Sequence, residues 1–262
     1  MKVTLITGAS GGIGEAFARA LAKKRQNLVL VARSENKLHQ ICDELMLNYG
    51  ITAHYVAVDL NDFEADQRLF YETQKHGMEV DWLINNAGFG SMGDFADLDL
   101  ERELEMIGLN IMVLVALTHR YLQGMRARKS GTIINVSSAA SFQPIPYMAT
   151  YAATKAFVTS FSEAIAEENR GFGIKVLNCC PGATETNFFD AAGMKEPFSV
   201  KGVQTPEQVV EETLNAVEKG KTRVITGWTN WLAAHAATFA PNTLVTKAIA
   251  GQLRPRLAKM LK

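Results

Sequence analysis

The chain has 262 residues, of which 47% are hydrophobic and 21% charged, so it can bury a large core and is not a disordered protein. Its 27 basic and 27 acidic residues give no net charge, which argues against nucleic acid as a partner. Three cysteines, two of them adjacent at Cys179 and Cys180, do not form a disulfide framework and favour a reducing, cytoplasmic compartment. The first apolar run is too short for a signal peptide, and we expect no membrane span.

Short β-rich runs alternate with longer helical patterns along the chain. The expected strands are residues 2–8, 28–33, 52–60, 80–88, 131–138, 173–182 and 222–227. The expected helices are residues 12–26, 35–50, 62–77, 99–128, one that ends near Gly171, and 206–220.

This alternation predicts right-handed βαβ units, and the near-continuous apolar strands predict a parallel sheet that is buried on both faces. We therefore expect one α/β domain over residues 1–262, a doubly wound Rossmann-like sheet of about seven strands with helices on both faces. Residues 1–135 form mainly the dinucleotide-binding half and 136–228 the half with the catalytic residues and the substrate loop. Residues 229–262 form an apolar and basic C-terminal extension.

A cluster of glycines follows the first strand, in the sequence TGASGGIG. Gly8, Gly12 and Gly14 have the spacing G-x-x-x-G-x-G between a strand and a helix. Glycines at this place allow a tight turn and bring backbone N–H groups of the helix N-terminus close to a phosphate. A purely structural turn is the alternative, but the position directly after the first strand favours a dinucleotide site.

The second strand ends at Ala32 and Arg33, where an NAD site usually has an acidic residue. A small residue leaves room for a 2′-phosphate, and Arg33 offers a bidentate cation. Ser34 adds a hydroxyl group that could also bind the phosphate. The nearby Glu35 counts against a phosphate site, and the alternative is that Arg33 is an ordinary surface residue. We expect NADP(H) in preference to NAD(H), with Asp59 near the adenine amino group.

Tyr151 and Lys155 lie one helical turn apart in the alanine-rich stretch PYMATYAATKAF, so they share a helix face. On its own, such a pair is most often an exposed tyrosine beside a surface lysine. The pair gains meaning from the other motifs of the chain. These are TGASGGIG at 7–14, NNAG at 85–88, GLNIMV around Asn110, INVSSAA at 134–140, YAATK at 151–155 and PGATET at 181–186.

With these motifs in this order, the chain resembles the short-chain dehydrogenase/reductase family, of the Tyr-x-x-x-Lys type, and within it a group of reductases whose substrates are unassigned. The resemblance covers roughly the first 190 residues. It implies that Tyr151 is the general acid that protonates a carbonyl oxygen as hydride arrives, or the base in the reverse reaction. It also implies that Lys155 lowers the pKa of this phenol and binds the nicotinamide ribose.

Two further residues complete the catalytic set that the resemblance implies. Ser138 would hold the carbonyl oxygen, and we prefer it to Ser137, which points the other way if the strand geometry persists. Asn110 would hold a water in a proton relay to Lys155, and a helix-kink amide is the alternative. The resemblance places Thr186 against the carboxamide or a phosphate, with Thr184 as its rival.

The expected cofactor-binding residues follow the strand ends and the glycine turn. They are Gly8, Ser10, Gly11, Gly12, Ile13, Gly14, Arg33, Ser34, Asp59, Leu60, Asn86, Ala87, Gly88, Tyr151, Lys155, Pro181, Gly182, Thr184 and Thr186. The expected substrate-binding residues are mostly large and apolar, which indicates a lipophilic carbonyl compound or alcohol. They are Ser138, Phe89, Phe142, Ile145, Tyr147, Phe188, Phe189 and Met194. The histidines and cysteines lack ligand spacing, so we expect no metal.

The C-terminal extension combines Trp, Leu and Ile residues with Lys247, Arg254, Arg256 and Lys259. Helices that cover the substrate site are one interpretation, and a basic amphipathic segment on a membrane or on another subunit is the other. A homo-oligomer, dimer or tetramer, is expected by analogy with the family. The alternatives to an oxidoreductase are a non-catalytic NADP-binding regulator, an epimerase or dehydratase, and a peripheral membrane protein that acts through this segment.

Overall fold

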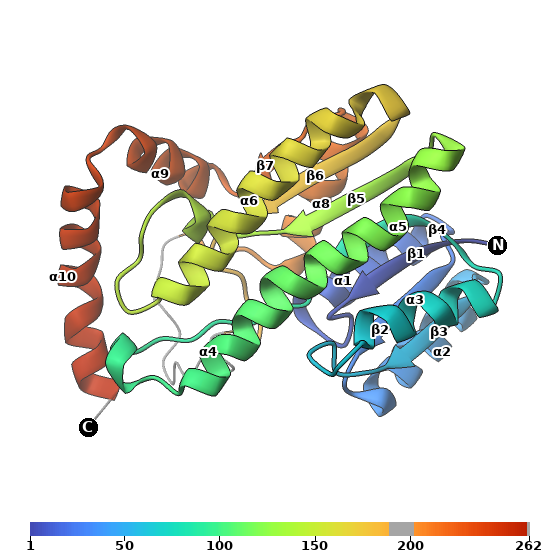
Figure 1. Ribbon diagram of the computed structural model, residues 1–262, viewed down its shortest axis with the longest axis horizontal. Coiled ribbons are helices and arrows are strands. Elements are labelled where there is room, and N and C mark those ends of the chain that lie inside the picture. Colours follow the sequence, from blue (N-terminus) through green and yellow to red (C-terminus); the bar gives the residue numbers. More distant parts are fainter. Residues whose placement is uncertain (189–201, 261–262) are drawn as a thin grey trace.

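The computed structural model describes residues 1–188 and 202–260. Within them, seven strands form one parallel sheet in the order β3-β2-β1-β4-β5-β6-β7 (Figure 1). The strands are β1 (Lys2–Thr7), β2 (Leu28–Ala32), β3 (Ala53–Ala57), β4 (Glu79–Asn85), β5 (Gly131–Val136), β6 (Ile174–Cys180) and β7 (Arg223–Ile225). The predicted doubly wound fold is confirmed.

Helices cover both faces of this sheet. They are α1 (Gly12–Lys23), α2 (Glu35–Tyr49), α3 (Ala65–Lys75), α4 (Leu100–Ile107), α5 (Leu114–Arg128), α6 (Ala149–Asn169), α8 (Pro206–Glu218), α9 (Trp228–Phe239) and α10 (Asn242–Met260). Shorter helical turns are η1 (Phe95–Asp97), η3 (Ala139–Phe142) and η4 (Arg170–Phe172), and η2 (Gly108–Val113) is a π-helical segment.

The two faces of the sheet carry separate hydrophobic clusters, because successive side chains of a strand point to opposite faces. On one face, Ile6 and Leu30 pack with Phe17 of α1, with α2 and with α8. On the other, Leu5 and Val29 pack with α3, α5 and α6. The sheet is thus the middle layer of three, as its apolar strands predict.

The strand order reverses at β1 and β4, since the chain moves outward from β1 to β3 and then returns to β4 on the other side of β1. A doubly wound sheet opens a crevice at the carboxyl ends of its strands at this point. The predicted strands overran these ends by a few residues, because the motifs that follow them are loops at the crevice.

The single helix predicted for residues 99–128 is interrupted. The segment η2 inserts a π-helical turn between α4 and α5, and Asn110 lies in it. Beyond β7, α9 and α10 leave the sheet and lie beside one end of the molecule (Figure 1).

Candidate active site

A cavity of about 1120 Å³ opens at the carboxyl ends of β1, β4, β5 and β6. It extends from the turn before α1 to the apolar residues that follow β5 and β6. This is the crevice that the strand order predicts, and it brings together motifs that are far apart in the sequence.

The turn between β1 and α1 is held in shape by close backbone contacts. Gly8 and Gly12 have φ values of +66° and +53°, which side chains disfavour. A Cβ atom on Gly14 would lie 2.2 Å from the Gly8 carbonyl oxygen. The Asn86 amide from the β4 loop donates to the carbonyls of Thr7 and Gly8 at 2.9 and 3.3 Å. The glycines therefore build a tight cradle of backbone at the N-terminus of α1.

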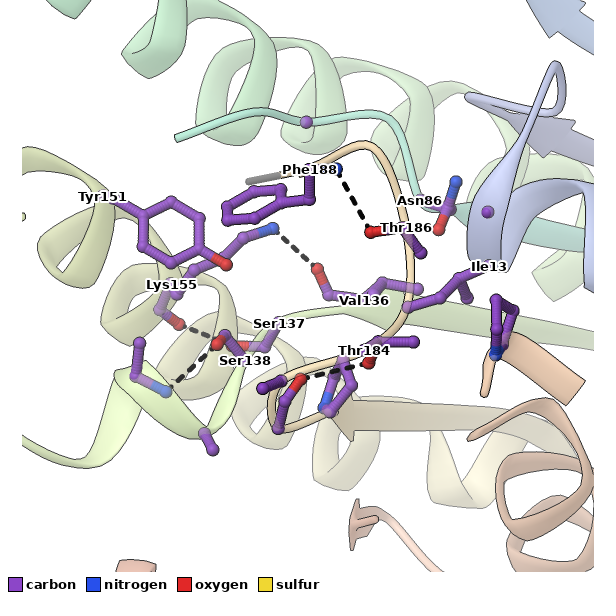
Figure 2. Close-up of a pocket in the computed structure, with 18 of the residues that line it drawn as sticks. Ile13, Asn86, Val136, Ser137, Ser138, Tyr151, Lys155, Thr184, Thr186 and Phe188 are labelled. Carbon is purple, nitrogen blue, oxygen red and sulfur yellow. Dashed lines mark hydrogen bonds between the residues drawn. The ribbon is translucent and has the colours of Figure 1, made fainter. Parts of the chain in front are cut away.

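The other end of the cavity holds two buried polar side chains of α6. Tyr151 is 7% exposed and Lys155 is 5% exposed, and both face the centre of the cavity (Figure 2). The Lys155 amine donates to the Val136 carbonyl at 2.9 Å and lies 5.9 Å from the centre of the Tyr151 ring. Because both side chains are buried, the alternative of an exposed tyrosine beside a surface lysine is excluded.

Burial dominates the titration of both groups. It raises the pKa of Tyr151 to about 12, against a smaller opposing effect of its hydrogen bond with Ser138. Burial also lowers the pKa of Lys155 to about 8. We expected Lys155 to lower the pKa of Tyr151. In this structure the net shift of the tyrosine is upward, because desolvation outweighs its neighbours.

The two serines after β5 both line the cavity, but their hydroxyl groups have different partners. The Ser138 hydroxyl is hydrogen-bonded with Tyr151 and accepts from the Ala140 N–H at 3.1 Å. The Ser137 hydroxyl donates to the Lys155 carbonyl at 2.8 Å and pairs with Thr159. Ser137 thus fixes α6 against β5, and Ser138 is the serine beside Tyr151.

Asn110 lies next to Lys155 but does not line the cavity. Its amide exchanges hydrogen bonds with the backbone of Phe89, at 3.2 Å and 3.0 Å, and donates to Thr154 at 3.1 Å. A Cβ atom on Gly88 would lie 2.7 Å from Asn110 Oδ1 and 3.5 Å from Lys155 Nζ. The π-helical turn therefore brings this amide close to the lysine across a glycine.

The two candidate threonines lie in the loop after β6 and have different contacts. Thr184 donates to the Gly182 carbonyl at 3.1 Å and is buried. Thr186 lies against the glycine turn, since a Cβ atom on Gly12 would meet its methyl group at 2.9 Å. Its hydroxyl accepts from the Phe188 N–H at 3.2 Å (Figure 2). Both line the cavity, and Thr186 is the one that reaches the phosphate cradle.

Three of the expected apolar residues, Phe89, Ile145 and Phe188, line the cavity, and the Phe188 ring lies 5.2 Å from that of Tyr151. Phe142 does not line it: the turn η3 directs this ring to Cys180 and Ile225. Phe189 and Met194 lie outside the described residues.

Tyr147 does not line the cavity either. Its backbone has a φ of +67°, and its hydroxyl accepts a hydrogen bond from Arg254 of α10 at 3.0 Å. Tyr147 thus ties the loop before α6 to the C-terminal helix.

Arg33 and Asp59 lie outside this cavity and line a separate hollow of about 480 Å³ beyond β2 and β3. The Arg33 side chain is 80% exposed and lies 3.6 Å from the Asp59 carboxylate. Arg68, which the sequence did not single out, also lines this hollow. Ser34 precedes α2, and Leu60 is part of the core.

The C-terminal helices contribute cavity residues that no motif indicated. Those from α9 are Asn230, Ala233 and Ala234, and those from α10 are Ile249, Gln252 and Leu253. Leu253 packs with Met148 and Tyr151 of the α6 region. Both C-terminal helices thus lie against the cavity.

Comparisons with known proteins identify the family of this chain. The model of the short chain dehydrogenase family matches residues 2–197. A very-long-chain 3-oxoacyl-CoA reductase of Anas platyrhynchos is 33% identical over 81% of this chain and 68% of its own length. The chain belongs to the short-chain dehydrogenase family. A 7beta-hydroxysteroid dehydrogenase of Mediterraneibacter gnavus is also similar, 30% identical over 88% of each chain.

Solved structures of short-chain dehydrogenases have the same fold. One from Sphingobium yanoikuyae, in complex with NADPH, has a TM-score of 0.81 at 29% identity and covers 86% of this chain and 87% of its own. A 7beta-hydroxysteroid dehydrogenase structure reaches 0.85 at 28% identity, over 95% of this chain and 96% of its own. As a member of this family, the chain is an oxidoreductase that binds a nicotinamide cofactor.

The cavity of this short-chain dehydrogenase fits such a cofactor. The Gly8 and Gly14 backbones leave no room for side chains of their own, whereas a Cβ atom on Gly11 would have no neighbour within 4 Å, so that part of the turn is open. Backbone donors at the start of α1 suit a pyrophosphate. Of the expected cofactor residues, these line the cavity: Gly8, Ser10, Gly11, Gly12, Ile13, Asn86, Ala87, Gly88, Tyr151, Lys155, Pro181, Gly182, Thr184 and Thr186.

Proposed function

We propose that this protein is an NADP(H)-dependent reductase of lipophilic carbonyl compounds, or dehydrogenase of the corresponding secondary alcohols, with Tyr151 as the general acid or base. The observation that carries this proposal is the position of the Tyr151 hydroxyl. It is buried beside Ser138, where the glycine-built end of the cavity meets the apolar end.

The bound nicotinamide would supply a hydride to the carbonyl carbon, and this chain would supply the proton. Because burial holds the pKa of Tyr151 at about 12, the phenol is protonated at neutral pH and can donate to the carbonyl oxygen. Ser138 would hold that oxygen through its hydroxyl group. Both residues act on the same atom, which is the arrangement that carbonyl reduction needs.

Lys155 would act through charge and position. Its buried amine, next to Gly88, would hold the nicotinamide ribose and stabilise phenolate when the proton leaves Tyr151. Asn110, hydrogen-bonded to the Phe89 backbone, would position the water that returns a proton to Lys155. Thr186 and the start of α1 would hold the pyrophosphate.

The choice of NADP(H) rests on Arg33 at the end of β2. An exposed guanidinium in a hollow beyond β2 and β3 can bind a 2′-phosphate. Arg68 adds a second cation there, although it is paired with Asp62 of the same hollow at 3.5 Å. The pairing of Arg33 with Asp59 opposes this, because the phosphate would compete with the carboxylate. The NADPH in the Sphingobium yanoikuyae structure favours the phosphate.

The lipophilic substrate class rests on the cavity wall. Phe89, Ile145 and Phe188 line it together with Ile249 and Leu253 of α10. The similar reductase and steroid dehydrogenase are named for acyl and steroid substrates, which are apolar. We also propose a homo-oligomer, a dimer or tetramer, which sedimentation velocity would test.

A calorimetric titration tests the cofactor assignment. NADPH and NADH are titrated into the wild type and Arg33→Ala, and wild-type NADPH oxidation is then followed with a panel of lipophilic ketones. We expect NADPH to bind at least about tenfold more tightly than NADH, and Arg33→Ala to remove that difference. Equal wild-type affinities would overturn the role of Arg33, and binding of neither would overturn the proposed function.

A further inference from the structure

Large apolar side chains are exposed together on α9 and at the start of α10. Trp228 is 78% exposed and Phe239 is 88% exposed. We call the set the α9 face: Trp228, Trp231, Leu232, Phe239 and Leu244. Apolar residues that gather on an exposed face mark a contact with a partner or a membrane.

The sequence around this face contains no Asp, Glu, Lys or Arg. The uncharged stretch is residues 224–246, between Arg223 and Lys247, in a chain of which 21% is charged. Inside a core such a stretch would be ordinary, but here much of it lies on the surface. This composition is typical of a surface that becomes buried when it binds a partner or a membrane.

The charges that follow the stretch are all basic. Glu218 is the last acidic residue of the sequence, whereas Lys247 and Arg254 lie exposed on α10. An apolar face with basic residues beside it is complementary to anionic lipid headgroups. A second copy of this chain fits less well, because a symmetric contact of the face with itself would bring like charges together.

The position of the acidic residues limits which part of the segment can face a membrane. Asp94, Asp97, Asp99 and Glu101 lie around η1 and the start of α4. The C-terminal half of α10 packs on that region, since Leu253 contacts the cluster of Met92 and Met106. Anionic lipid would be repelled there, so the favourable contact is confined to α9 and the first turns of α10.

The inner side of α9 belongs to the cavity. Asn230, Ala233 and Ala234 line it, whereas Trp228 and Trp231 face outward. A single helix therefore separates the exposed face from the proposed active site. A lipophilic compound dissolved in the membrane would reach the cavity with little passage through water.

We propose that the α9 face is a membrane-docking surface, which lies in the headgroup region of an anionic lipid bilayer with Trp228, Trp231 and Phe239 inserted. Tryptophan is favoured at this depth, and a helix with an apolar side and nearby Lys or Arg residues can bind in the plane of the interface. None of the helices among the described residues is long and apolar enough to cross a bilayer, so the contact is peripheral. This proposal does not depend on the proposed catalytic reaction.

Vesicle sedimentation tests it with the intact protein. Vesicles of phosphatidylcholine alone and of phosphatidylcholine with phosphatidylserine are compared. The first variant is Trp228→Ser/Trp231→Ser/Phe239→Ser, none of which lines the cavity. The matched control is Leu47→Ser/Phe63→Ser/Tyr71→Ser, which removes three large exposed side chains from the region of α2 and α3.

We expect the wild type and the control to bind the phosphatidylserine vesicles at least about tenfold more tightly than the first variant does. Lys247→Gln should weaken the preference for phosphatidylserine, by about fivefold if one cation contributes about 1 kcal/mol. NADPH binding, measured in parallel, should be unchanged in every variant, which shows that the fold is intact.

Two results would overturn the proposal. One is a control variant that loses as much vesicle binding as the first variant does. The other is a wild type that binds neither kind of vesicle; suppose that it also forms an oligomer, which the first variant dissociates in sedimentation velocity. The α9 face would then be an interface between copies of the chain.

Discussion

The two ends of the cavity differ in the atoms that shape them. At the glycine turn, backbone atoms of Gly8, Gly12 and Gly14 form the wall, and steric exclusion fixes it. At the α6 end, the side chains of Tyr151 and Lys155 form the wall, and desolvation sets their pKa values. Substitutions at the first end should therefore act on folding and cofactor binding, and those at the second on chemistry.

The largest expected effect is that of Tyr151→Phe, which removes the proton donor and little else. We expect kcat for carbonyl reduction to fall by about 10²–10⁴-fold, the usual contribution of a general acid. The affinity for NADPH should change by less than about threefold. Steady-state kinetics and calorimetry on the same preparation measure the two. A variant that keeps most of its kcat would remove Tyr151 from the mechanism.

Gly14→Ala should damage the glycine end through the fold. Alanine is the better helix former by about 1 kcal/mol, but its Cβ would lie 2.2 Å from the Gly8 carbonyl oxygen. The clash should win, so the free energy of unfolding should fall by about 3 kcal/mol in denaturant titrations.

The matched control is Gly11→Ala, because no atom lies within 4 Å of its Cβ position and its backbone is extended. Its free energy of unfolding should stay within about 1 kcal/mol of the wild type. Equal losses in the two variants would mean that close backbone contact does not explain the glycines.

Lys155→Met should separate stability from activity. At pH 7 the folded protein holds a buried ammonium whose pKa burial lowers to about 8 from the ordinary lysine value of 10.5, at a cost of about 3 kcal/mol in stability. Removing it should raise the free energy of unfolding by about 1–3 kcal/mol, less what the hydrogen bond to Val136 contributes. Activity should be lost.

The sign of the pH dependence follows from the same shift. Between about pH 8 and 10.5 the unfolded chain binds more protons at Lys155 than the folded chain, so wild-type stability should gain on that of Lys155→Met as pH rises. Denaturant titrations of both proteins at matched pH measure the difference. A gap that stays constant over this range would mean that the lysine titrates normally.

The serine pair gives the closest comparison, because the two residues are neighbours and carry the same functional group. Ser138→Ala should lower kcat by about 10²-fold, since it removes a donor to the carbonyl oxygen, with little change in stability. Ser137→Ala breaks the hydrogen bond to the Lys155 carbonyl and should cost about 1 kcal/mol of stability, with kcat nearly unchanged. Thermal denaturation measures the stability of both variants, and steady-state kinetics measures kcat. If Ser137→Ala lost kcat and Ser138→Ala lost only stability, Ser137 would be the serine that holds the carbonyl oxygen.

The sequence predicted the sheet and the cradle well, because both depend on local rules. Apolar runs between helical patterns predict buried parallel strands, and glycines after the first strand predict close backbone contacts. Ser138 was preferred to Ser137 because side chains of a strand alternate, and the two hydroxyl groups do have different partners: Ser137 donates to the Lys155 carbonyl, whereas Ser138 is hydrogen-bonded with Tyr151.

The remaining features depend on tertiary contacts that no short pattern encodes. The turn η3 directs Phe142 away from the cavity, and the contact with Arg254 holds Tyr147 outside it. No sequence motif pointed to Asn230 and Leu253, because α9 and α10 have the composition of ordinary surface helices. The upward shift of the Tyr151 pKa depends on its burial, which spacing alone does not give.

Transfer of the hydride itself is the most direct test of the proposed function. The protein is incubated with NADPH deuterated at the reactive face of the nicotinamide and with a panel of lipophilic ketones, and the alcohols are analysed by mass spectrometry. The proposal predicts deuterium on the carbinol carbon with the wild type and nearly none with Tyr151→Phe. NADPH that binds tightly but transfers no deuterium to any ketone would contradict it and would favour a non-catalytic NADP-binding regulator.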